Sequence, residues 1–77
     1  MPPTANTTVA QALQESQASG LARLDAQLLL LFAMGKASYD RSWLVAHDDA
    51  LLSQDAIATS ARLTLERARG LPVAFLV

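Results

Sequence analysis

The chain has 77 residues, which suits one domain with a modest core, because a chain near this size buries only about 60% of the surface it exposes when unfolded. Six basic and seven acidic side chains give a formal net charge of -1, so no basic excess is available to drive nucleic-acid binding. The absence of cysteine excludes disulfides and thiolate metal ligands and is compatible with a cytoplasmic protein.

No targeting or membrane signal is visible in the sequence. Residues 1–6 are polar and carry two prolines, and we expect a disordered tail there, without the basic and apolar regions of a secretory signal. The longest apolar run, Leu28–Met34, has seven residues, against the ~20 that a helix needs to cross a bilayer. We therefore expect a soluble, cytoplasmic protein.

The first predicted helix runs from Thr8 to Ser19. Thr7 precedes it and is suited to accept hydrogen bonds from the free amides of the first turn. Gly20 supplies the left-handed residue that ends it. Val9 and Leu13 lie four residues apart and therefore share one apolar face.

The second predicted helix spans about Ala22 to Met34 and ends at Gly35. Asp25 lies in its first turn, where a carboxylate interacts favourably with the positive end of the helix. Its Leu28–Met34 segment is apolar in every direction around the axis, because side chains advance by about 100° per residue. A helix that is apolar all round must be covered on all sides, so we expect it at the centre of a bundle.

A short third helix and a longer fourth one follow. Ser38 is a suitable cap for the third helix, which should end near His47. Ser53 caps the fourth helix, which runs to Arg69 and ends at Gly70.

The fourth helix has a predicted apolar stripe about 100° wide. The stripe consists of Ile57, Ala58, Ala61, Leu65 and Ala68. Leu63 points away from it. With no strand-like alternation anywhere, the sequence predicts an all-α fold, a compact bundle of four to five short helices over residues 7–70 with an apolar central second helix.

Three segments together resemble a known family. Residues 23–30 read RLDAQLLL, similar to the pattern R-x-D-A-x-L-L-L, and residues 43–47 read WLVAH, similar to L-x-A-H. Residues 67–76 read RARGLPVAFL, similar to R-x-x-G-x-P-x-x-[YF]-[IL]. In this order and spacing they resemble the N-terminal domain of the bacterial release-factor glutamine methyltransferase family, known as PrmC or HemK. Ala22 stands where the family often has proline, and Phe75 where it more often has tyrosine.

The resemblance implies a larger protein than these 77 residues. Family members continue into a Rossmann-like methyltransferase domain, which binds S-adenosylmethionine through a Gly-rich loop. An Asn-Pro-Pro-Tyr motif there holds the Gly-Gly-Gln glutamine of class-1 peptide release factors. Neither motif occurs here, so residues 71–77 are expected to form a short turn leading to an absent catalytic methyltransferase domain. We expect no cofactor, no metal and no catalytic residue in this fragment, which should be inactive alone.

Five residues are candidate contacts for the release factor or for the chain's own C-terminal catalytic domain. They are Arg62, Leu63, Arg67, Arg69 and Phe75. The simpler interpretation of the arginines is that cations near a helix C-terminus complement its negative end. The same reasoning predicts that His47 caps the carbonyls at the end of its helix, that Trp43 lies in the core, and that Asp25 has only a nearby surface arginine, Arg23, beside it.

Three functions from different classes remain open. The first is docking of the release factor, so that its glutamine reaches the following domain. The second is a purely structural domain that stabilises the catalytic half. The third is a small helix-turn-helix nucleic-acid binder, for which the fourth helix is the only candidate recognition helix and the net charge is unfavourable. The target could also be a ribosomal protein, which a related family methylates.

Overall fold

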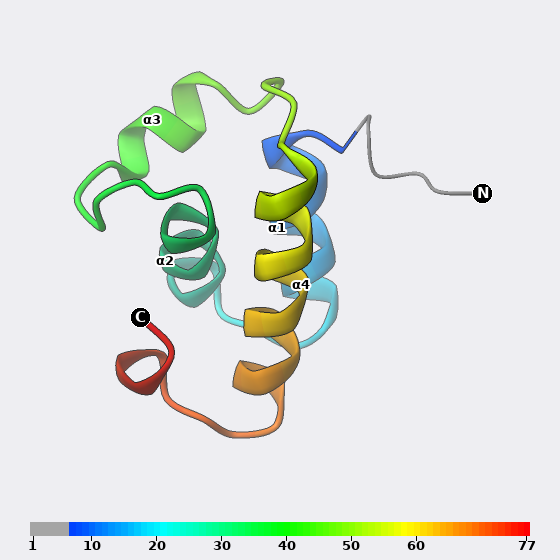
Figure 1. Ribbon diagram of the computed structural model, residues 1–77, viewed down its shortest axis with the longest axis vertical. Coiled ribbons are helices and arrows are strands. Elements are labelled where there is room, and N and C mark those ends of the chain that lie inside the picture. The colour runs from blue at the N-terminus through cyan, green and yellow to red at the C-terminus, as the bar shows by residue number, and fades with distance from the viewer. Residues whose placement is uncertain (1–6) are drawn as a thin grey trace.

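The computed structural model describes residues 7–77 and shows a bundle of helices in which α2 touches every other element. The elements in chain order are α1 (Val9–Ala18), α2 (Arg23–Ala33), α3 (Arg41–Ala46), α4 (Gln54–Ala68) and the single-turn 3-10 helix η2 (Val73–Phe75) (Figure 1). No strand occurs in residues 7–77, so the predicted all-α bundle is confirmed. The predicted disordered tail, residues 1–6, lies outside the described residues.

The start of α1 is fixed by a capping box one residue later than the predicted cap. Thr8, not Thr7, is the capping residue, and its hydroxyl accepts from the backbone N–H of Gln11 at 3.2 Å. The Gln11 side-chain oxygen in turn accepts from the backbone N–H of Thr8 at 2.8 Å. Two of the donors that a helix start leaves without a partner are satisfied in this way.

The loop between α3 and α4 satisfies the next free donors of α1. The backbone N–H of Val9 donates to the carbonyl oxygen of Ala50 at 3.0 Å. The N–H of Ala10 donates to the carbonyl oxygen of Asp48 at 2.9 Å. Since these amides have no partner inside their own helix, the loop completes the first turn of α1.

All three glycines end helices, as the sequence predicts. Gly70 has φ of +106°, in the left-handed region. Its N–H donates to the carbonyl of Arg67 (3.0 Å), and the N–H of Leu71 donates to that of Glu66 (3.3 Å). This is the Schellman arrangement, which closes the last carbonyls of α4 and turns the chain toward η2.

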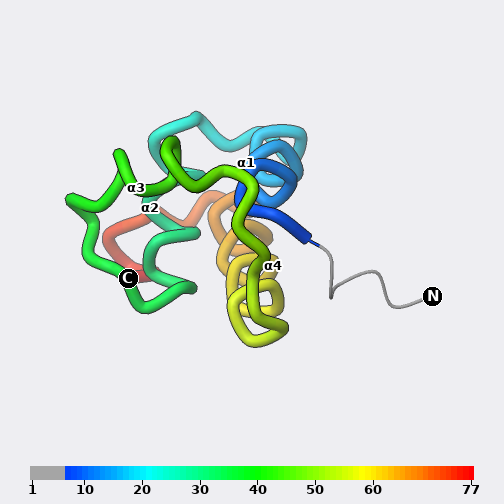
Figure 2. Tube along the Cα trace, turned by 90° about the horizontal axis from the view of Figure 1, so that it is seen from above, coloured from blue at the N-terminus to red at the C-terminus, as the bar shows by residue number. Residues whose placement is uncertain are grey.

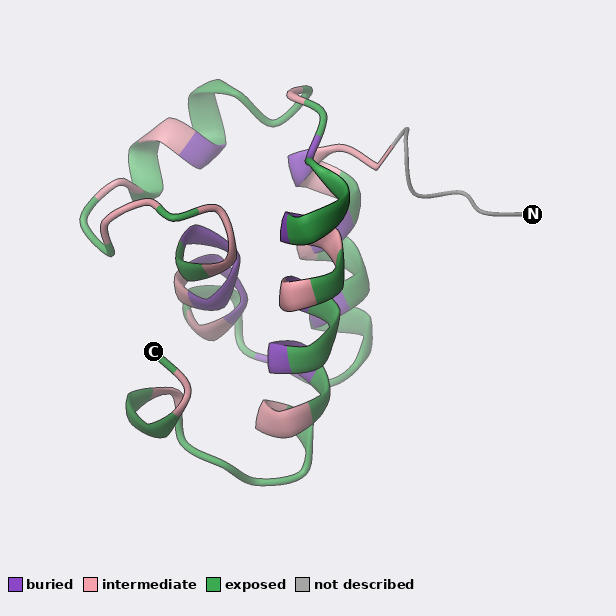
Figure 3. Cartoon of the chain, in the orientation of Figure 1, coloured by how far each residue is buried: buried purple, intermediate pink, exposed green. Residues whose placement is uncertain are grey.

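The core has two clusters, and Leu13 of α1 packs against both. The first cluster consists of Val9, Ala12, Leu30, Leu31, Leu44, Leu52 and Ala56. The second consists of Leu21, Ala26, Leu29 and Leu63. Buried residues concentrate where α1, α2 and α4 face one another, whereas α3 and η2 are mostly exposed or half-buried (Figure 3). The clusters therefore hold α2 between the other helices.

Helix α2 is central, as predicted, but it is not covered on all sides. Leu29, Leu30 and Leu31 are buried, whereas Leu24 and Phe32 are each 47% exposed. At about 100° per residue the exposed side chains fall on one arc of roughly 80°, which no element in residues 7–77 covers. The prediction that the apolar run is enclosed all round is therefore wrong for this face.

The predicted cap of α3 is also wrong. The helix begins after Asp40, whose side chain makes no capping hydrogen bond, and Ser38 lies exposed before it. The N–H of Asp40 donates to the carbonyl oxygen of Ala37 at 3.0 Å and closes a turn that includes Ser38. The helix therefore starts later than the serine suggests, and Leu44 is its one buried residue.

Helix α4 has the predicted bounds, with Ser53 accepting from the N–H of Ala56 at 3.1 Å, but it is rotated relative to the prediction. Its buried residues are Ala56, Ser60, Leu63 and Thr64. Leu63, expected to point away from the core, is only 1% exposed. It packs among Leu21, Ala26 and Leu29, and this one large side chain sets which side of α4 faces α2.

Candidate docking groove between α1 and α4

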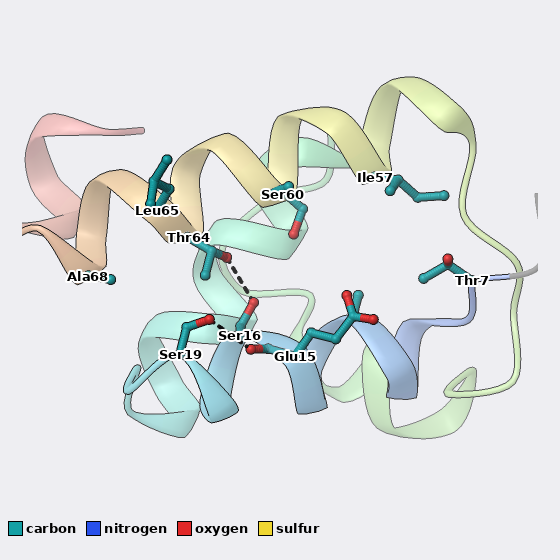
Figure 4. Close-up of a pocket in the computed structure, with 11 residues that line it drawn as sticks. Thr7, Glu15, Ser16, Ser19, Ile57, Ser60, Thr64, Leu65 and Ala68 are labelled. Atoms are coloured by element: carbon teal, nitrogen blue, oxygen red, sulfur yellow. Dashed lines mark hydrogen bonds between the residues drawn. The ribbon is translucent and has the colours of Figure 1, made fainter. Parts of the chain in front are cut away.

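A groove of about 370 Å³ lies between α1 and α4 (Figure 4). Its lining residues are Thr7, Ala12, Glu15, Ser16, Ser19, Ile57, Ser60, Ala61, Thr64, Leu65 and Ala68. Most of these side chains are small, so the two helices face each other without filling the space between them. We call this feature the α1–α4 groove.

Two buried hydroxyl groups of the groove, those of Ser16 and Thr64, are hydrogen-bonded to each other. Ser16 Oγ of α1 and Thr64 Oγ1 of α4 lie 2.8 Å apart, and either can be the donor (Figure 4). The hydroxyl of Ser19 donates to the carbonyl oxygen of Glu15 at 3.1 Å. Because Ser16 and Thr64 satisfy each other, an apolar partner leaves neither hydroxyl unpaired, whereas the hydroxyl of Ser60 has no hydrogen bond within residues 7–77 and remains open to a polar group of a partner.

The α4 wall of the groove is the stripe that the sequence assigns to the core. Ile57, Ala61, Leu65 and Ala68 all line the groove, and Leu65 is 51% exposed. The stripe is about 16 Å long, since Ala68 lies eleven positions after Ile57 and each position adds 1.5 Å. Rotating α4 so that Leu63 points inward leaves Ala61, Leu65 and Ala68 exposed, while Ile57 stays half-buried against the first core cluster. The sequence pattern identified the stripe but not the side on which it would lie.

Two of the candidate arginines border this stripe on the side away from α1. At 100° per residue, Arg62 and Arg69 project next to Leu65 on that side, and both are exposed. Arg69 Nη1 lies 3.5 Å from Glu66 Oε1 in an exposed ion pair, while Arg62 has no ion pair or hydrogen bond within residues 7–77. The guanidinium of Arg62 is therefore available to a partner.

The opposite wall carries a single acidic group. The carboxylate of Glu15, on α1, reaches into the space between the two helices (Figure 4). It forms no ion pair with any residue in the part of the chain that the structure describes. The groove thus has a carboxylate on the α1 side and guanidinium groups beyond the α4 side.

The other three candidates lie in different surroundings. Arg67 Nε donates to Asp25 Oδ2 at 3.0 Å, so the partner of Asp25 is Arg67 and not the nearby Arg23. Leu63 is buried and does not reach the surface. Phe75 is exposed on η2, which packs against α2 and not beside the groove (Figure 2). The structure brings only Arg62 and Arg69 together at one surface.

The single histidine caps a helix, as predicted. The His47 Nδ1–H donates to the carbonyl oxygen of Trp43 at 3.0 Å, and the two rings stack with centroids 4.4 Å apart. Lys36 Nζ lies 4.0 Å from the ring centroid of Trp43, a residue of α3, in a cation–π contact. Trp43 is half-buried against the first core cluster, so its core prediction holds in part. Stacking and capping account for all three side chains.

Residues 7–77 contain no group of His, Asp and Glu side chains arranged to hold a metal ion. No helix in the same range is long and apolar enough to span a membrane.

Comparison with known proteins identifies the family. The profile described as the PrmC N-terminal domain matches residues 5–77. Release factor glutamine methyltransferases from Xylella fastidiosa strains Temecula1 and 9a5c are each 39% identical to the chain over 66 residues, which is 86% of this chain but 23% of each relative. No solved structure matches significantly. The chain spans about a quarter of those relatives, and it belongs to the PrmC N-terminal domain family.

Proposed function

We propose that this chain is the substrate-recognition domain of a protein-(glutamine-N5) methyltransferase, and that a class-1 release factor docks on the α1–α4 groove. The family supports the first part, because the curated relatives are release factor glutamine methyltransferases. The second part rests on the surface of the domain. Its carrying observation is that the apolar side chains of Ile57, Ala61, Leu65 and Ala68 line an open groove, in which Leu65 is 51% exposed.

The groove suits an amphipathic helix of the release factor. Partner helices bind grooves through apolar side chains spaced three or four residues apart. The 16 Å wall, about three helical turns long, matches such spacing. Acidic side chains beside the apolar row of the partner would face Arg62 and Arg69, and a basic one would face Glu15 across the groove.

Docking contributes to methylation through proximity. A second contact surface holds the large protein substrate in register and raises the effective concentration of its Gly-Gly-Gln glutamine at the active site. The S-adenosylmethionine site and the reacting groups belong to the remainder of the full-length protein, and the 77 residues alone do not catalyse the transfer. This function places the domain in the cytoplasm, with a protein substrate and not a nucleic acid as its partner.

The test is steady-state methylation of a release factor by the full-length enzyme with altered grooves. The variants are Leu65→Asp and the charge reversal Arg62→Glu with Arg69→Glu. We expect KM to rise with kcat nearly unchanged, because the lost contacts bind substrate and transition state equally. Val45→Asp and Arg41→Glu, which change exposed residues of α3, are the matched controls and should leave KM unaltered.

The purely structural alternative gives a different result. If the groove variants lower the melting temperature and the activity in parallel, the domain acts as a scaffold and the docking proposal fails. An unchanged KM for both groove variants, with the protein folded, would also overturn it. A ribosomal protein as the preferred substrate would appear as methylation of that protein and not of the release factor.

A further inference from the structure

A second exposed apolar surface lies on the other side of the bundle. Leu24 and Phe32 project from the outer arc of α2, with half-buried Leu28 between them at four-residue spacing. Residues spaced in this way form one continuous stripe on a helix. Exposed apolar stripes of this kind commonly mark interaction surfaces.

The end of the chain extends this surface. In η2 and the two residues after it, Val73 and Leu76 turn inward against the second core cluster, whereas Phe75 and Val77 remain exposed. The two inward residues anchor η2 on α2, and Figures 1 and 2 show it beside that helix. We call the outward-facing side chains of α2 and of the segment around η2 the α2–η2 face; they are the exposed Leu24, Phe32, Phe75 and Val77 and the half-buried Leu28.

The α2–η2 face and the α1–α4 groove look in different directions. The buried arc of α2 faces α1 and α4, and the outer arc of α2 faces away from both. The groove lies between α1 and α4, whose common partner is the buried arc of α2. Two different molecules, or two parts of an assembly, can therefore be held at the same time.

We infer that the methyltransferase part of the full-length protein packs against the α2–η2 face, and that the α1–α4 groove is thereby left open for the substrate. The matched stretch is 23% of each relative, so most of each relative lies outside it. The family is an N-terminal domain, so in the relatives that remainder follows on from the position of Val77. The inference rests on the proposed function only in assuming that this protein also carries such a remainder.

Covalent attachment favours this occupant over the others. Where a domain follows the position of Val77, as in the relatives, its first residues begin at the α2–η2 face itself, which gives the attached domain an effective concentration in the millimolar range. A second copy of the chain or a release factor would compete at its much lower free concentration. The exposed Phe75 is well suited as an anchor, because aromatic side chains contribute large contact areas at interfaces.

Hydroxyl-radical footprinting of the full-length protein tests the inference. Phe75 is 78% exposed and belongs to the face. Tyr39, which lies between α2 and α3 and outside the face, is 85% exposed. An open face would give both rings comparable modification. We expect loss of modification at Phe75 and Phe32 with Tyr39 still modified, independently of protein concentration and without added release factor.

Variants sharpen the result. The pair Leu24→Ser with Phe32→Ser should restore modification of Phe75 in the full-length protein, and Val45→Ser, an exposed change on α3, should not. Equal modification of Phe75 and Tyr39 in the unaltered protein overturns the inference. Protection that disappears on dilution indicates a second copy, and protection that needs the release factor indicates the substrate; both also overturn it.

The two proposals fail separately. Leu65→Asp alters the groove only, so it should raise KM while Phe75 stays protected. If Leu65→Asp has no effect and Phe75 is protected, groove docking is wrong and the domain contact stands. If KM rises and Phe75 is freely modified, the reverse holds.

Discussion

Arg67 near the end of α4 holds Asp25 in the first turn of α2, with Nε 3.0 Å from Oδ2. The two residues are 42 positions apart, and each belongs to a different segment of the family pattern. The ion pair therefore fixes the end of α4, and with it the path into η2, against the start of the central helix. The carboxylate of Asp25 also places a negative charge at the positive end of α2.

Replacing Asp25 with Asn should lower the free energy of unfolding by about 0.5–1 kcal/mol. The contribution of the ion pair to stability is modest because the two side chains are 35% and 24% exposed, so water screens their charges. Urea unfolding of Asp25→Asn, Arg67→Gln and the double variant gives the coupling between them. Glu66→Gln, which removes the more exposed ion pair between Glu66 and Arg69, is the control and should cost less. A coupling of zero would show that the pair is incidental.

The Ser16–Thr64 hydrogen bond predicts a non-additive pair of substitutions. Ser16→Ala or Thr64→Val alone leaves one buried hydroxyl without its partner and should cost about 1–3 kcal/mol. Making both changes removes the unpaired group, so the double variant should be more stable than the sum of the single losses implies. Thermal unfolding of the four proteins measures this. Strictly additive losses would mean that the two hydroxyl groups act independently.

The apolar run of α2 should respond very unevenly to truncation. Leu30→Ala or Leu31→Ala removes a side chain at most 1% exposed and should cost about 2–5 kcal/mol, including the cavity that remains. Phe32→Ala removes a side chain that is half in water and should cost well under half as much in residues 1–77. Equal losses at Leu31 and Phe32, measured by chemical denaturation, would contradict the outward placement of Phe32.

Gly70→Ala should destabilise the domain by about 1–2 kcal/mol through the backbone alone. The glycine has φ of +106°, and a Cβ added there meets nothing within 4 Å, so no steric clash contributes. Gly70→Asn is the matched control and should cost less, because Asn tolerates positive φ better than Ala. The difference between the two melting temperatures isolates the conformational term. If Ala and Asn behave alike, the left-handed turn is not the source of the loss.

Helix ends could be predicted from the sequence because they depend on local chemistry. Ser53 caps α4 and Gly20 ends α1 through bonds to residues within one turn. Where the local signal is ambiguous, the prediction fails by a residue or two, as at Thr7 and Thr8, or Ser38 and Asp40.

The rotation of α4 could not be predicted in the same way. Both of its faces offer apolar side chains, and the choice between them depends on where Leu63 finds a cavity among residues of α2 and its preceding loop. The groove depends on a contact between Ser16 and Thr64, which are 48 positions apart. Neither relationship leaves a periodic signal in the sequence. The outward position of the α4 stripe therefore depends on tertiary packing and not on the local sequence.

The loop that completes the first turn of α1 has a consequence for how the chain can be cut, extended or made. Because Asp48 and Ala50 accept the amides of Ala10 and Val9, these two amides of the first helix reach their acceptors only after the ribosome has delivered the residues after α3. An affinity tag or protease site inserted between His47 and Ser53 would loosen a helix that lies two elements earlier. That connection is consequently a poor place for an insertion, although it looks like an ordinary surface linker.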